Sequence, residues 1–87
     1  MSKSIIIADS STIGKIGLRA VIDKLDGFQV INEVETSSEL LESYNTSNPD
    51  LVIIDFLSEG FDIDVIVKIK REYVDSKILA VTPMQSS

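Results

Sequence analysis

Three polar residues that could take part in chemistry stand at the ends of short apolar runs: Asp9, Asp55 and Thr82. The runs are Ile5–Ala8, Leu51–Ile54 and Ile78–Val81. In open α/β sheets, ligands bind outside the carboxyl ends of the parallel strands. If the first and third runs are neighbouring strands, Asp9 and Asp55 lie side by side at one rim of the sheet. The alternative is that each acid only caps the helix or loop that follows it.

The segments around these residues alternate between strand-like and helix-like patterns. The apolar runs are rich in β-branched residues, which is typical of parallel strands covered on both faces. A weaker run, Phe28–Val34, is interrupted by polar residues and predicts an edge strand. Helical spacing predicts helices over residues 11–25, from 36 to Asn48-Pro49, and over 62–74, with Ser10 or Ser11, Thr36 and Asp62 as N-caps. This alternation predicts one α/β domain over residues 1–87, with a parallel sheet and right-handed crossovers.

The composition excludes several functional classes. The chain of 87 residues has no His and no Cys, so histidine catalysis, thiolate zinc sites and disulfides are excluded. The net charge is −6 and the basic residues are scattered, which argues against direct nucleic-acid binding. No apolar run approaches the roughly 20 residues of a membrane span, and the N-terminal run is too short for a signal peptide. We therefore expect a cytoplasmic protein with no membrane partner.

The chain resembles the receiver domain of two-component response regulators from Ile5 to Pro83. The segments that carry the resemblance are IIIADSSTIGKIGLRAVID, NPDLVIIDFLSEGFDIDVIVKIKREY and KILAVTP. The resemblance implies a flavodoxin-like, receiver-type open parallel sheet. It also implies that Asp55 is at the position that accepts a phosphoryl group from a histidine kinase, and that Thr82 is at the switch position. A Mg²⁺ ion would be bound by Asp9, Asp55 and the backbone carbonyl of Leu57.

The chain also departs from that family's pattern. Ser10 stands where the family has its second acid, and Mg²⁺ prefers carboxylate ligands. We therefore expect weak Mg²⁺ binding and slow or absent phosphorylation. The sequence ends five residues after Thr82, so the family's last strand and helices, with their lysine, have no counterpart in it. Lys77 cannot replace that lysine, because it precedes the fourth strand.

These departures leave three functional hypotheses. The first is a degenerate receiver that works without phosphorylation, by self-association or by binding a histidine kinase or response regulator. The second is a working phosphoacceptor that uses Asp55 and Mg²⁺. The third is another enzyme on the same scaffold, but no phosphate-binding loop or nucleophile motif is present, and Gly14 and Gly17 lie inside the first predicted helix. We favour the first hypothesis, a binding module and not an enzyme.

The absent last helix predicts an exposed apolar face. We expect that face to carry one set of strand residues, Val52, Ile54, Leu79 and Val81, and the fourth strand to be an open edge. Leaving several hundred Å² of apolar surface in water would be unfavourable at about 25 cal/mol per Å². We therefore expect a homodimer or a higher symmetric oligomer. The alternative is that the chain is a fragment of a longer protein.

Overall fold

The computed structural model of the chain describes residues 2–55 and 60–81. Within these ranges a single parallel sheet is built from β1 (Lys3–Ala8), β2 (Phe28–Val34), β3 (Leu51–Ile54) and β4 (Ile78–Ala80). The strand order across the sheet is β2-β1-β3-β4, so β2 lies at an edge, as predicted. The two strands that carry Asp9 and Asp55 at their ends, β1 and β3, are direct neighbours in the middle of the sheet.

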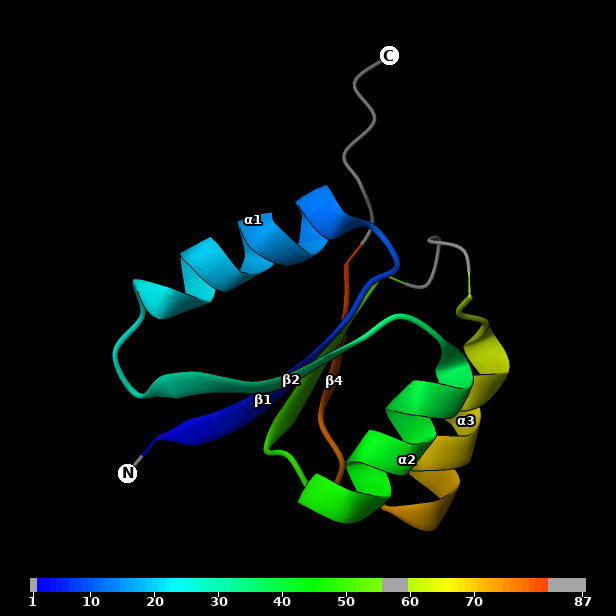
Figure 1. Cartoon of the computed structure of the whole chain (residues 1–87). Coiled ribbons are helices and arrows are strands. Elements are labelled where there is room, and N and C mark those ends of the chain that lie inside the picture. The colour runs from blue at the N-terminus through cyan, green and yellow to red at the C-terminus, as the bar shows by residue number, and fades with distance from the viewer. Residues whose placement is uncertain (1, 56–59, 82–87) are drawn as a thin grey trace.

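Three helices cover the two faces of this sheet. Helix α1 (Thr12–Asp23) lies on one face, while α2 (Ser37–Ser47) and α3 (Ile63–Glu72) lie together on the other (Figure 1). Each helix starts at a side-chain oxygen that accepts a hydrogen bond from the backbone N–H three residues later. The capping residues are Ser11, Thr36 and Asp62. No helix in the described part of the chain is long and apolar enough to cross a membrane.

The central strand β1 supplies side chains to two separate cores. Ile6 and Ala8 pack in the core beneath α2 and α3, and Ile5 and Ile7 pack with Ile22 of α1. All five of these residues are buried. This alternation follows from the two-residue period of a strand. It explains why the run is apolar at every position, since both faces of the strand are covered.

The predicted grouping of Val52 and Ile54 with Leu79 was wrong. Ile53 is the residue that pairs with Leu79, whereas Val52 pairs with Ile78. Paired residues of neighbouring strands point to the same face of the sheet. Val52 and Ile54 therefore lie in the core beneath α2 and α3, where both are fully buried. An error of one residue in register moves a side chain to the opposite face.

Strand β2 contains one irregularity that the sequence did not predict. Its pairing with β1 passes from Val30 directly to Asn32, so Ile31 is an extra residue in the strand. Such a bulge shifts the alternation of side chains by one position. As a result Val30 and Glu33, three residues apart, both point towards α1. The bulge therefore allows a carboxylate of β2 to face α1.

Candidate functional site

The ends of three strands place three carboxylates at one rim of the sheet. One level of the sheet consists of four paired residues: Val34, Ala8, Ile54 and Ala80. The next residue along each of the first three strands is Glu35, Asp9 and Asp55, respectively. Backbone hydrogen bonds continue across this level, from Asp9 N to Val34 O at 3.1 Å and from Asp55 N to Ala8 O at 2.9 Å. The predicted placement of Asp9 beside Asp55 is therefore confirmed.

Asp9 is buried against the first turn of α1. Only 3 % of the residue is exposed. Its Oδ1 accepts a hydrogen bond from the backbone N–H of Ser11 at 2.8 Å. A Cβ atom added to Gly14 would lie 2.2 Å from Asp9 Oδ2, so the other carboxylate oxygen rests directly on the helix backbone. The positive end of the helix dipole favours a carboxylate at this position.

Asp55 and Ser10 are both half-buried at the same rim. The alternative interpretation of Asp9, that it caps the helix that follows, is partly correct, because its carboxylate accepts a hydrogen bond from Ser11, the N-cap of α1. Asp55 differs from Asp9 in being more open to solvent. Leu57 and Thr82, the other two residues that the resemblance assigns to the site, lie outside the described residues.

Gly60, where the described chain resumes after Asp55, contacts the turn between β2 and α2. Gly60 has φ of 94°, a conformation that glycine adopts without strain. Its carbonyl accepts a hydrogen bond from Ser37 N at 2.8 Å, and a Cβ atom there would lie 2.6 Å from the backbone oxygen of Glu35. A side chain at position 60 is therefore excluded by both backbone conformation and space. Gly60 therefore lies directly against the backbone of Glu35.

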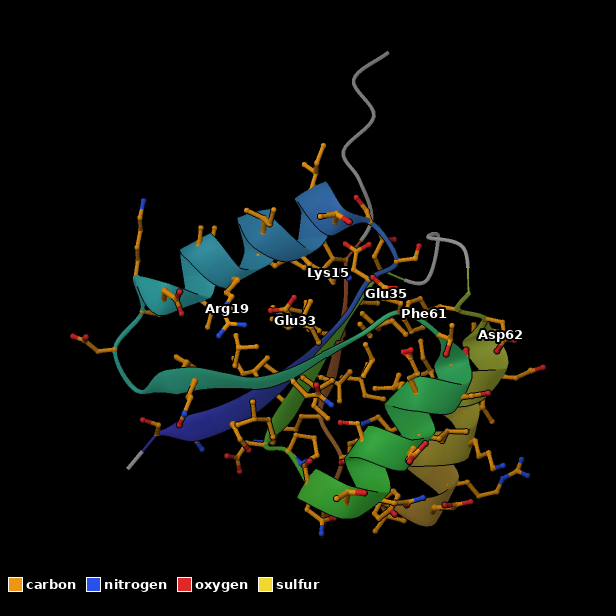
Figure 2. All side chains as sticks on the ribbon, viewed as in Figure 1. Lys15, Arg19, Glu33, Glu35, Phe61 and Asp62 are labelled. Atoms are coloured by element: carbon orange, nitrogen blue, oxygen red, sulfur yellow. The ribbon has the colours of Figure 1, made fainter. Side chains whose placement is uncertain are left out.

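Two ion pairs between α1 and β2 border the rim, and sequence reasoning missed both. Lys15 bonds through Nζ to Glu35 Oε2, and Arg19 bonds to Glu33 at 2.5 Å (Figure 2). The hydrogen bond that Lys15 donates to Glu35 raises the pKa of Lys15, although partial burial opposes this. The available signal was the spacing of two basic residues four apart on α1, because that spacing places them on one face of the helix.

The rim is a poor match to the requirements of Mg²⁺. That ion needs near-octahedral oxygen ligands and is usually held by one or two carboxylates. Of the two carboxylates assigned to it, Asp9 is buried with one oxygen bonded to Ser11 and the other packed on Gly14. Ser10 offers a hydroxyl in place of a third carboxylate. Among the described residues, no cluster of three or more acidic, His or Cys side chains has the geometry of a metal site.

Comparison with known proteins places this fold. No protein-family model matches the chain. An uncharacterized transcriptional regulatory protein of Bacillus subtilis strain 168, YhcZ, is 32 % identical over 79 residues, which are 90 % of this chain and 37 % of that protein. A LuxR-family two-component response regulator from Aurantimonas sp. SI85-9A1 has a TM-score of 0.88 at 25 % identity, over 99 % of this chain and 62 % of that one. The chain is a receiver-type homologue of response regulators.

Two further structures concern the response regulator RcsB. The isolated receiver domain of RcsB from Salmonella enterica serovar Typhimurium has a TM-score of 0.87 at 24 % identity, over 99 % of this receiver-type chain and 65 % of that one. A structure of two RcsB dimers bound to two parallel DNAs has a TM-score of 0.87 at 25 % identity, over 97 % and 44 % of the two chains. The chain spans little more than a third of YhcZ, and about two thirds of the isolated receiver domain. The likeness confirms the predicted flavodoxin-like fold.

Proposed function

We propose that this receiver-type chain works through protein contacts, including contacts with a second copy of itself, and not through phosphorylation of Asp55. The observation that carries the proposal is the donor set at the rim. Ser10 replaces a carboxylate, and Asp9 is buried with Oδ1 bonded to Ser11 N and Oδ2 packed on Gly14. Phosphoryl transfer depends on cations that offset the charge of the equatorial oxygens. A rim that binds Mg²⁺ with low affinity therefore gives little stabilisation to phosphoryl transfer.

An apolar surface beside α1 supports the self-association part of the proposal. Leu79 of β4 is 52 % exposed and lies on the same face of the sheet as α1, because its partner Ile53 belongs to the α1 core. Val21 and Leu25 are also at least half exposed. Val21 lies three residues after Leu18 on the same flank of α1, and Leu25 follows the end of that helix. We call Val21, Leu25 and Leu79 the α1–β4 surface.

A second copy of the chain is the occupant we propose for the α1–β4 surface. Helix α1 contacts β1 and β2, whereas Leu79 of β4 on the same face is left half exposed. Strand β4 is also an edge of the sheet within the described residues, and an edge strand offers unpaired backbone groups to another chain. The matching surfaces of two copies would meet about a two-fold axis. A histidine kinase or another response regulator is the competing occupant.

The phosphorylation part of the proposal is tested with a small phosphodonor. The chain is incubated with acetyl phosphate and Mg²⁺ and followed by intact mass, with Asp55→Asn as the control. We expect no stoichiometric adduct on the parent chain and a clear adduct on Ser10→Asp. A stoichiometric adduct on the parent that Asp55→Asn abolishes would reject the proposal. That result would instead favour the second candidate function, in which Asp55 accepts a phosphoryl group. The half-buried position of Asp55 at the end of its strand is compatible with that function.

The self-association part is tested by sedimentation velocity at micromolar concentration. We expect a dimer or a larger species for the parent and a monomer for Leu79→Asp. The matched control is Val67→Asp on α3, where Val67 is similarly exposed at 47 % but lies on the opposite face of the sheet. That control should keep the parent's association state. A parent chain that is folded and monomeric by this measurement would contradict self-association.

A further inference from the structure

The side chain of Lys15 is less exposed than that of Arg19, the other basic residue on the same face of α1. The side chain of Lys15 is 13 % exposed, compared with 51 % for Arg19. Lys15 lies one turn nearer the start of α1, and its partner Glu35 is the first residue after β2 (Figure 2). The Lys15–Glu35 pair therefore stands at the rim itself. The Arg19–Glu33 pair stands below it, at a residue still within β2.

The charges around Lys15 are those of the rim. Glu35, Asp9 and Asp55 follow one level of three neighbouring strands, so they form a row of three carboxylates. The hydrogen bond that Lys15 donates to Glu35 is the main cause that raises the pKa of Lys15, and the charges of Glu35, Glu33 and Asp9 act in the same direction. Lys15 is consequently protonated at neutral pH and brings one fixed positive charge to the row.

We propose that Lys15 is the internal counter-ion of the rim and lowers the affinity of Asp9 and Asp55 for divalent cations. A fixed ammonium group attracts the same carboxylates that a metal ion would use, and it repels the metal ion. Its ion pair with Glu35 and the burial of most of its side chain hold it in place. It thus acts on the metal through charge, without being a ligand or contacting a substrate. This inference extends the proposed function by naming what keeps a cation from the site.

The size of the effect follows from Coulomb's law. At a separation of one Debye length, about 8 Å, a unit charge in the dielectric constant of water would change the affinity of a divalent ion by roughly sixfold before screening. Screening at physiological salt reduces this, because the Debye length is itself about 8 Å. Partial burial of the pair acts in the opposite direction, because it lowers the effective dielectric constant. We therefore expect removal of the Lys15 charge to raise Mg²⁺ affinity by roughly three- to tenfold.

The test is a Mg²⁺ titration of the whole chain, followed by the backbone amide shifts of Asp9, Ser10 and Asp55, with no phosphodonor present. Lys15→Gln should bind Mg²⁺ about three- to tenfold more tightly than the parent. Lys15→Arg keeps the charge and should match the parent. The matched control is Arg19→Gln, which removes the neighbouring ion pair of the same helix face. It should leave Mg²⁺ affinity within about twofold of the parent, because its charge lies farther from the rim.

A second pair of variants separates charge from structural support. Glu35→Gln should weaken Mg²⁺ binding, because it leaves Lys15 without its partner near the rim. The double variant Lys15→Gln with Glu35→Gln restores the parent's net charge at the rim and should return the affinity towards that of the parent. A purely structural tie between α1 and β2 would be broken in the double variant as much as in either single one. It would therefore produce no such compensation.

Two results would overturn the proposal. The first is Mg²⁺ affinity in Lys15→Gln equal to that of the parent, including the case in which neither responds up to tens of millimolar Mg²⁺. The second is an equal increase in Lys15→Gln and Arg19→Gln, which would indicate a general effect of net charge. Neither result depends on phosphorylation. A parent chain that accepts a phosphoryl group would reject the proposed function and leave the role of Lys15 to be judged by this titration alone.

Discussion

Two glycines on the same helix provide a direct test of how Asp9 is held. Gly14 and Gly17 both lie in α1, and the substitution of each by Ala adds one methyl group. In a helix interior this change normally stabilises by about 1 kcal/mol, because Ala loses less backbone entropy than Gly on folding. A Cβ at position 17 would meet nothing within 4 Å, whereas one at position 14 would lie 2.2 Å from Asp9 Oδ2. The two substitutions should therefore change stability in opposite directions.

The magnitude at position 14 follows from the hydrogen bond that must break. A carbon atom at 2.2 Å is far inside the usual contact distance of about 3.5 Å, so the carboxylate of Asp9 must rotate away. Rotation removes the bond that Asp9 Oδ1 accepts from Ser11 N, a bond to a charged group worth about 1.5–3 kcal/mol. The helix-propensity gain offsets about 1 kcal/mol of this loss. Gly14→Ala should therefore lower the free energy of unfolding by about 0.5–2 kcal/mol.

Urea denaturation measures both variants on one scale. With an m value of about 1 kcal/mol per molar urea for a chain of this size, the midpoint should fall by about 0.5–2 M in Gly14→Ala. It should rise by up to about 1 M in Gly17→Ala. The same rise in both variants would show that Asp9 does not rest on the helix backbone. The account of Asp9 as a carboxylate already committed to α1 would then have to be abandoned.

Three further predictions concern the rest of the fold. Hydrogen bonds from Ser4 lower the pKa of Asp50 in the folded chain. The ionised carboxylate therefore stabilises the fold at pH values above the ordinary pKa of about 4, and this stabilisation is lost as the pH falls through the lower pKa of the folded state. Parent and Asp50→Asn should therefore differ in urea midpoint at pH 6 and converge by about pH 2, and a constant difference would argue against this linkage. Asn48 caps the end of α2 in the left-handed conformation, with φ of 45°. Asn48→Ala should therefore lower the free energy of unfolding by about 1 kcal/mol, whereas Asn48→Gly should stay within about 0.5 kcal/mol of the parent. Equal effects of the two variants in thermal or urea unfolding would contradict a left-handed cap. Leu40→Ala should cost about 2–5 kcal/mol by the same measurement because Leu40 is fully buried, and Val67→Ala, at a half-exposed position, should cost less than about 0.5 kcal/mol.

The arrangement of strands and helices was predictable from the sequence because each element carries a local signal. The apolar runs of β1 and β3 indicate strands covered on both faces, and the capping residues Thr36 and Asp62 mark the starts of α2 and α3. Asp9 and Asp55 could be placed together because parallel strands of an α/β sheet present their carboxyl ends at one rim. These inferences need only the order of elements and the two-residue period of a strand.

The details that the sequence did not predict depend on register and on contacts between distant segments. The extra residue Ile31 in β2 has no local signal, yet it decides that Glu33 faces α1. The face of Val52 was predicted wrongly because the offset between β3 and β4 is set by their pairing and not by either strand alone. The pair formed by Lys15 and Glu35 joins residues 20 positions apart, so it becomes visible only once α1 packs on β2.

The replacement at Ser10 and the charge of Lys15 should both lower the affinity of the rim for Mg²⁺. Ser10 leaves the position after Asp9 without a negative ligand, and Lys15 brings a positive charge that acts on Asp9. Restoring an acid with Ser10→Asp supplies the missing oxygen ligand but leaves the ammonium group in place, so it should recover only part of a receiver's affinity for Mg²⁺. Because charge effects on one ion multiply in affinity, Ser10→Asp combined with Lys15→Gln should bind Mg²⁺ about three- to tenfold more tightly than Ser10→Asp alone. If the two changes together gave no gain over Ser10→Asp, the absent carboxylate would by itself account for the weak site, and Lys15 would be only a link between α1 and β2.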